Sequence, residues 1–153
     1  MLYTYDPAKV VLNVAGVNLE DLADGTFVSV ERTSETFVKS TGSDGITTRI
    51  KQNDKSGSIT FTLQQSSPSN GVLSSIMVLD ESTGDGVVPV MVKDNLGYTV
   101  IVSAMAWIRK PPTVAYAKEN QTREWVFDCA NLDIVVGGAA GFVTVPPIPG
   151  IPL

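Results

Sequence analysis

A strict alternation of apolar and polar side chains runs through residues 57–65, whose sequence is GSITFTLQQ. Ile59, Phe61 and Leu63 fall on one side of an extended chain, and the hydroxyl and amide side chains between them fall on the other. Successive side chains of a strand point to opposite faces, so this period of two indicates a strand with one buried face. A single strand of this kind is not stable alone, so other segments have to complete its sheet.

Further strands are indicated by short runs rich in β-branched and aromatic residues and bounded by turn residues. These runs cover residues 9–17, 27–32, 37–40, 87–92, 98–108 and 122–136. Pro89 has no backbone N–H, so we expect its strand to lie at a sheet edge or to begin there. Residues 93–97 have the composition of a hairpin turn, in which Gly97 suits a positive φ.

Only one segment carries a convincing helical pattern. It begins near Pro68 and Ser69, which favour a helix N-terminus, and ends at the turn formed by residues 83–86. The apolar residues at roughly helical spacing are Val72, Leu73, Ile76, Met77 and Leu79. About seven strands and one helix predict a mainly β fold, namely a two-sheet β-sandwich or barrel with one flanking α-helix, formed by residues 1–138.

Two segments fit poorly into the body of such a fold. Residues 41–57 are polar, with turn residues at both ends of a β-branched run, and this pattern predicts a long hairpin arm that projects from the body. Residues 139–153 contain four prolines among apolar residues, which excludes a helix or a central strand and predicts an extended C-terminal arm. Projecting arms are devices for contacts between subunits, so the chain is expected to self-assemble.

The sequence offers little for catalysis or for metal binding. It has no histidine, which removes the commonest general base and metal ligand. The acidic residues around Gly84 miss the calcium-loop spacing, and no glycine-rich segment matches a phosphate loop. Cys129, Trp107 and Trp125 are each expected in the core, because each lies in an apolar strand pattern. We therefore expect no enzyme activity, no cofactor and no metal.

Charge and cysteine content restrict the partners and the compartment. The net charge of −5 repels phosphate backbones, which argues against sequence-specific binding of nucleic acid. The single cysteine excludes an intramolecular disulfide and fits folding in a reducing cytoplasm. The first residues lack the pattern of a signal peptide, and no apolar run reaches membrane-spanning length, so no membrane insertion is expected.

Several short stretches, in their order and spacing, give the chain a family resemblance. They are residues 5–10 (YDPAKV), 23–32 (ADGTFVSVER), 67–70 (SPSN), 86–89 (GVVP), 106–112 (AWIRKPP) and 123–126 (REWV). With them the chain resembles the tail tube proteins of contractile-tailed bacteriophages over nearly all of residues 1–138. The resemblance implies hexameric rings stacked into a tube inside a sheath, and a location in the virion tail after assembly in the host cytoplasm. It also implies sheath, baseplate and tail-terminator partners, and genomic DNA that passes without specific binding.

The resemblance also assigns surfaces. A long hairpin in this family reaches the adjacent ring, which implies that residues 41–57 make the contact between rings. The residues predicted for this contact are Ile46, Thr47, Thr48, Arg49, Ile50 and Lys51. If the strands at 57–65 and 122–129 belong to the inner sheet, their non-core faces line the channel. The residues predicted to face the lumen are Ser58, Thr60, Thr62, Gln64, Glu124 and Asp128.

Alternatives remain open from the sequence. The inner tube of a type VI secretion system or of a phage-tail-like bacteriocin would have the same fold. A monomeric carbohydrate-binding sandwich is a third possibility, and it would carry exposed aromatic platforms. The two predicted strand faces could also lie against the sheath on the outer wall, because alternation fixes the faces but not which sheet is inner.

Overall fold

The computed structural model describes residues 2–138, so the proline-rich segment 139–153 lies outside the described residues. The mainly β fold with one flanking helix is confirmed. The elements are η1 (Pro7–Lys9), β1 (Val10–Val14), β2 (Val17–Asn18), β3 (Val28–Arg32), β4 (Phe37–Thr41), β5 (Thr47–Lys51), β6 (Gly57–Gln64), α1 (Ser69–Thr83), β7 (Val88–Asp94), β8 (Val100–Lys110), β9 (Thr122–Cys129) and β10 (Asp133–Val135).

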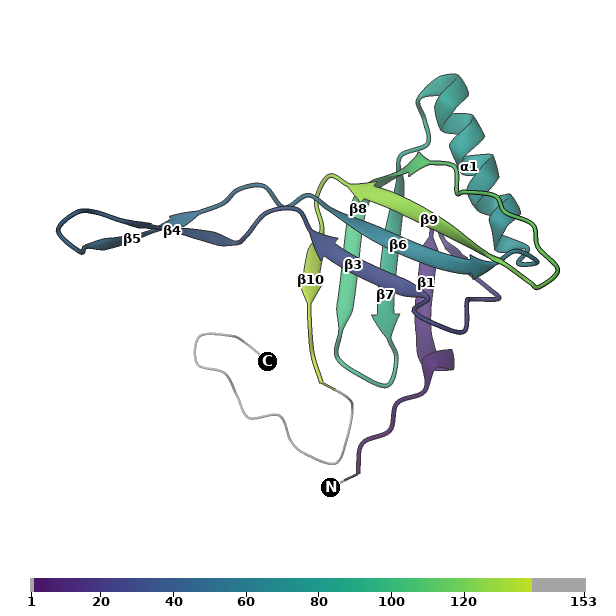
Figure 1. Ribbon diagram of the computed structural model, residues 1–153, viewed down its shortest axis with the longest axis horizontal. Helices are drawn as coiled ribbons and strands as arrows, with labels where there is room; N and C mark the ends of the chain where they lie inside the picture. Colours follow the sequence, from purple (N-terminus) through teal and green to yellow (C-terminus); the bar gives the residue numbers. More distant parts are fainter. Residues whose placement is uncertain (1, 139–153) are drawn as a thin grey trace.

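One antiparallel sheet folds over on itself to make both walls of the sandwich. Its strand order is β2-β1-β7-β8-β9-β6-β3, and β10 also pairs with β8. The long strand β8 joins the walls, because residues 100–106 pair with β7 and residues 106–110 pair with β9. We call β3, β6, β9 and residues 106–110 the β6 layer, and the strands around β7, with β10, the β7 layer. Figure 1 shows the β6 layer lying across the β7 layer.

The core lies between these two layers. In β6, Ile59, Phe61 and Leu63 are fully buried, which confirms the face predicted from the alternation. The rings of Phe61 and Phe127 meet edge to face, with centroids 5.4 Å apart. That geometry is favourable for aromatic pairs and adds to the stabilisation from burial. The alternation in β6 and β9 therefore fixes the pairing register of the two strands, since a slip by one residue would turn the core side chains outward.

Helix α1 closes one end of the sandwich. The side-chain amide oxygen of Asn70, Oδ1, accepts a hydrogen bond from the indole N–H of the buried Trp125, at 2.9 Å. Ser69 Oγ accepts from the backbone N–H of Glu20, so the loop before β3 is attached to the start of the helix. Gly84 follows the helix with φ 77°, a left-handed conformation that ends many helices and suits glycine.

Several boundaries predicted from the sequence are wrong in detail. The strand predicted at residues 9–17 is a hairpin, because Ala15 and Gly16 adopt positive φ between β1 and β2. The edge position expected for the strand with Pro89 is wrong, since β7 lies between β1 and β8, but the alternative, that the strand begins near Pro89, is correct to within one residue. Pro89 sits one residue after the strand begins, at a register shift where a missing N–H is tolerated.

At Gly57 and, less tightly, at Gly97 the space beside the backbone is restricted, and neither glycine has a positive φ. Gly97 was predicted to have a positive φ, but it is not among the glycines that do. A Cβ there would instead lie 2.7 Å from Asp94 Oδ2 and 3.0 Å from the Gly138 carbonyl oxygen. At Gly57 a Cβ would lie 2.5 Å from the Glu31 carbonyl oxygen. Only glycine fits at this position, where the chain returns from the arm to the body and β6 begins.

Candidate assembly surfaces

The projecting arm is a separate two-stranded ribbon, longer than the sequence predicted. Within residues 2–138, strand β4 pairs with β5 and with no other strand, so residues 37–40, expected in the body, belong to the arm. Every residue of β4 and β5 is exposed. Figure 1 shows the arm extending from one end of the molecule, with α1 near the opposite end. Such a ribbon has no core of its own, so its stable form requires other contacts.

The root of the arm is held by a small hydrogen-bond cluster. The Thr33 N–H donates to the Ser56 carbonyl oxygen at 3.0 Å. The Asp54 carboxylate accepts from the side chain and backbone N–H of Ser56 and from the hydroxyl of Ser34. These hydrogen bonds, with the Ser56 hydroxyl first, hold the pKa of Asp54 below its usual value. These hydrogen bonds therefore hold the two chain segments together where the arm joins the body.

The register of the arm divides its residues between two faces, because residues directly opposite in a ladder share a face. Phe37 pairs with Lys51, Lys39 with Arg49 and Thr41 with Thr47. We call these six residues the cationic face; the other face carries Val38 paired with Ile50 and Ser40 paired with Thr48. The residues predicted for ring contact are thus split, with Thr47, Arg49 and Lys51 on one face and Thr48 and Ile50 on the other. Ile46 lies outside both strands, in the exposed turn.

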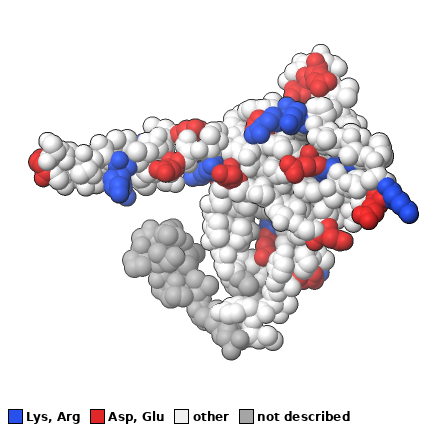
Figure 2. All heavy atoms as spheres, viewed as in Figure 1, with Lys and Arg blue, Asp and Glu red and all other residues white. Residues whose placement is uncertain are grey.

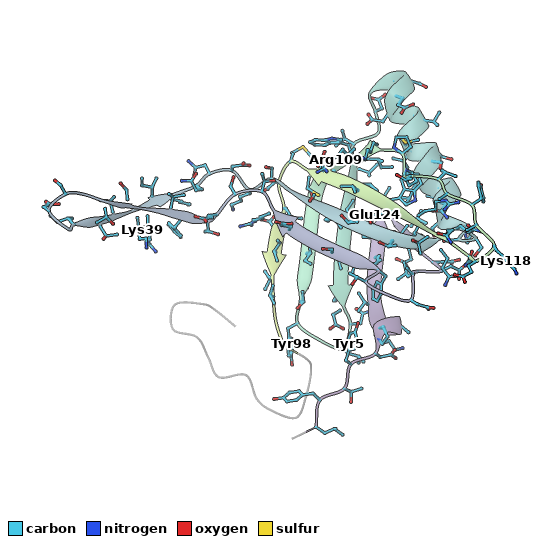
Figure 3. The ribbon with its side chains drawn as sticks, in the orientation of Figure 1. Tyr5, Lys39, Tyr98, Arg109, Lys118 and Glu124 are labelled. Carbon is cyan, nitrogen blue, oxygen red and sulfur yellow. The ribbon has the colours of Figure 1, made fainter. Side chains whose placement is uncertain are left out.

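The residues predicted to face the lumen come together on one surface. In the β6–β9 ladder, Ser58 is opposite Asp128, Thr62 is opposite Glu124 and Gln64 is opposite Thr122. Thr60 is opposite Val126 on the same face. All of them point away from the core, since the residues between them are buried. We call this surface the hydroxyl face, and Figure 3 labels Glu124 on it and Arg109 toward one end.

The sequence missed several further members of the hydroxyl face, among them Thr122 and Lys110, which lie opposite Gln64 and Val126. Ser29 and Glu31 of β3 join it opposite Thr60 and Ser58, and their alternation with valines was the available signal. Trp107 joins it from β8, opposite Asp128. Trp107 is half-buried beside the buried Ala106 and Ile108, so the expectation that it packs in the core is wrong. Arg109, next along β8, reaches the same face through its contact with Asp128.

The net negative charge of the hydroxyl face is smaller than the number of its carboxylates alone suggests. Arg109 forms a bidentate ion pair with Asp128, with Nη2 to Oδ1 at 2.6 Å. The hydrogen bond and the negative charge of Asp128 raise the pKa of the Arg109 guanidinium. The charge of Asp128 is therefore balanced by Arg109, which leaves Glu124 and Glu31 as carboxylates and Lys110 as a cation without an ion-pair partner on this part of the described chain. Figure 2, drawn in the orientation of Figure 1, shows acidic and basic side chains side by side over the β6 layer.

The outward face of the β7 layer has a different chemistry. Val102, Met105 and Val135 point away from the core and are exposed by 39%, 51% and 64%. The outward residues paired with them through the ladder include Met91 and Val100. Lys93 and Asp133 also lie on this face, opposite Val100 and Val102, so one wall of the sandwich is rich in hydroxyls and the other is mostly apolar. An exposed apolar sheet face of this kind is typical of a protein contact.

No cluster of three or more metal-ligating side chains occurs in residues 2–138. Cys129 is buried, as expected, and burial raises the pKa of its thiol, which opposes formation of a reactive thiolate. Across the same range no helix has both the length and the apolar character to span a bilayer.

Comparison with known proteins identifies the family. A relative described as "Structural protein ORF10" of Pseudomonas phage KPP10 is 30% identical over 143 residues, which cover 88% of this chain and 83% of that protein. The fold is similar to the anti-feeding prophage cap that terminates its tube, with TM-score 0.60, 8% identity and coverage of 88% of this chain and 93% of that one. It is also similar to a chain of the sheath–tube complex of an extracellular contractile injection system, PVC, with TM-score 0.55, 10% identity and coverage of 87% and 92%. At such identities these structures show a shared fold alone.

The sequence model of the bacteriophage PhiTE tail tube protein matches residues 12–137, most of the chain. The chain therefore belongs to the PhiTE-type bacteriophage tail tube proteins, a family of structural and non-enzymatic components of the virion tail.

Proposed function

We propose that this chain forms hexameric rings, and that the rings stack into the tube through which the phage genome passes inside a contractile sheath. The observation that carries the proposal is a pair of strand edges at the two ends of the β6 layer. Strand β3 pairs only with β6, and residues 107–110 of β8 pair only with β9 within the described part of the chain. Exposed strand edges invite pairing with another chain.

The strand directions suit pairing between identical copies. The four strands of the β6 layer run alternately up and down, because each neighbouring pair is antiparallel. In a ring of copies in the same orientation, β3 of one copy would therefore run antiparallel to β8 of the next. Closure of the ring by such pairs leaves no free edge, as in any closed barrel. The hexameric number is the one implied by the resemblance to contractile-tail tube proteins.

The contrast between the two outward faces favours the hydroxyl face as the lining of the channel. The side chains that β6 places on it are short and leave space for a polymer, and its three carboxylates outnumber its two cations, Arg109 and Lys110, so its net charge repels phosphate weakly. The apolar face of the β7 layer suits burial against protein, such as a neighbouring subunit or a sheath. The structural relatives come from a sheath–tube complex and a tube cap. We extend these partners to this chain as sheath and terminator proteins, with a baseplate at the other end of the tail.

The experiment is chemical labelling of tubes. In a Cys129→Ala background, cysteine is placed at Thr62 of the hydroxyl face or at Val102 of the β7 layer. A bulky maleimide is expected to label Thr62→Cys at least about tenfold more slowly in intact tubes than in dissociated subunits, because the reagent can reach the channel only through the ends of the tube. Val102→Cys in tubes without sheath is expected to react faster than Thr62→Cys. Equal and rapid labelling at position 62 in both states would place the hydroxyl face on the outer wall.

A further inference from the structure

The cationic face of the arm has a charge conflict that the subunit does not resolve. Lys39 lies directly opposite Arg49, and Lys51 is the next residue on the same face of the same strand. Like charges directly opposite each other in a ladder are destabilising. The only ion pair among residues 2–138 joins Arg109 and Asp128, so these three cations have no carboxylate partner in the described structure. Arg49 instead packs over the Phe37 ring, 4.1 Å from its centroid.

Helix α1 carries uncompensated negative charge at its C-terminal end, next to exposed aliphatic side chains. Val78 and Leu79 on its outward side are 55% and 49% exposed and border a hollow lined also by three serines. Asp80, Glu81 and Asp85 surround the C-terminal end of the helix, where negative charge opposes the helix dipole. Asp80 is half-buried and accepts from the Gly86 N–H, whereas Glu81 and Asp85 are exposed. No lysine or arginine occurs between Lys55 and Lys93, so local sequence supplies no compensation.

The two surfaces are complementary in charge and in apolar content. The cationic face offers Lys39, Arg49 and Lys51 with one exposed aromatic ring; the end of α1 offers carboxylates beside two exposed aliphatic side chains. Figure 1 shows the arm and α1 near opposite ends of the molecule, and Figure 2 shows acidic side chains gathered at the end of the helix. One copy cannot bring these surfaces together. A head-to-tail arrangement of copies can, and a contact of that type does not close on itself, so it extends into a filament.

We infer that the cationic face of the arm docks on the C-terminal half of α1 of a second copy of this chain, in the adjacent ring. The inference rests on the proposed function and specifies which surface receives the arm. Residues that break local rules within one subunit then satisfy each other between subunits, as is common at functional surfaces. The second face of the arm, with Val38 and Ile50, remains free in this arrangement to contact another subunit.

The test is reversal of charge on each surface and on both. Lys39→Glu with Arg49→Glu alters the arm, and Glu81→Lys with Asp85→Lys alters the helix. Each double variant is expected to lower the yield of sedimentable tubes at low salt by at least about tenfold, because like charges then face each other. The quadruple variant is expected to recover the yield to within about threefold of wild type. Far-UV circular dichroism verifies that every variant is folded, and neutral Lys39→Gln with Arg49→Gln should give an intermediate yield.

A matched control separates pairing from net charge. Combining the arm reversal with Asp24→Lys and Glu119→Lys, two exposed carboxylates elsewhere, restores the same net charge and should not restore tubes. Rescue by this control, or tubes unaffected by either reversal, would overturn this inference alone. Wild-type protein that never stacks would overturn the proposed function with it. Unchanged stacking, together with loss of duplex DNA binding by the arm variant, would assign the cationic face to phosphate and not to α1.

Discussion

Replacement of residues 35–54 by a short glycine–serine linker is expected to abolish tube formation and to leave the sandwich folded. The strands of the arm pair only with each other, and all of their residues are exposed, so the core loses nothing. The Thr33–Ser56 hydrogen bond that closes the root is retained. We expect the stacking constant to fall at least about 100-fold, which corresponds to roughly 2.8 kcal/mol. Negative-stain microscopy and sedimentation measure the loss.

A matched variant keeps the arm and changes one face. Val38→Thr with Ile50→Thr makes the apolar face polar but leaves the cationic face intact. It is expected to weaken stacking less than removal of the whole arm does. Tubes of normal length from the linker variant would show that rings stack without the arm, and would remove the arm from the assembly contact altogether.

Replacement of Phe127 by alanine is expected to lower the free energy of unfolding by about 3–5 kcal/mol, the usual cost of truncating a large aromatic in a core. Phe127 is fully buried on β9, and its ring meets Phe61 of β6 edge to face. The variant loses apolar burial and this aromatic contact, and leaves a cavity between the layers. Since typical domains are stable by only about 5–15 kcal/mol, this loss is a large fraction of the free energy of unfolding.

Urea unfolding of the linker variant measures this loss without interference from assembly, which would raise the apparent stability. The control is Val126→Ala, one residue earlier and half-buried on the hydroxyl face. It is expected to cost less than about 1.5 kcal/mol, because a half-exposed valine loses little burial. Equal losses for Val126→Ala and Phe127→Ala would mean that the two faces of β9 are not distinguished as the structure has them.

The sequence predicted the fold well where the pattern was strong. The alternation in residues 57–65 gave β6 and its buried face, and the run at residues 124–129 gave β9, since each strand has one face in the core. The hairpin at Ala15 and Gly16 was missed, because no Asn-Gly or Asp-Gly pair marks it. Its turn is stabilised by a side chain instead, with Asn13 Oδ1 accepting from the Gly16 N–H.

The candidate surfaces were only partly predictable. Alternation identifies which residues of β6 and β9 share a face, but it does not show that Trp107 and Glu31 join them, because that depends on strand order. The pairing of Arg109 with Asp128 likewise depends on β8 lying next to β9. The two faces of the arm required the β4–β5 register, and the sequence placed β4 in the body because Phe37 and Val38 are apolar.

Electron cryomicroscopy of the purified full-length protein, at micromolar concentration and several salt conditions, tests the central claim most directly. The proposal predicts stacked rings in which β3 of each subunit lies antiparallel to residues 107–110 of its neighbour, with the hydroxyl face toward the channel and the arm crossing to the next ring. Particles that remain single subunits under every condition, or rings whose β3 edges stay unpaired, would contradict it.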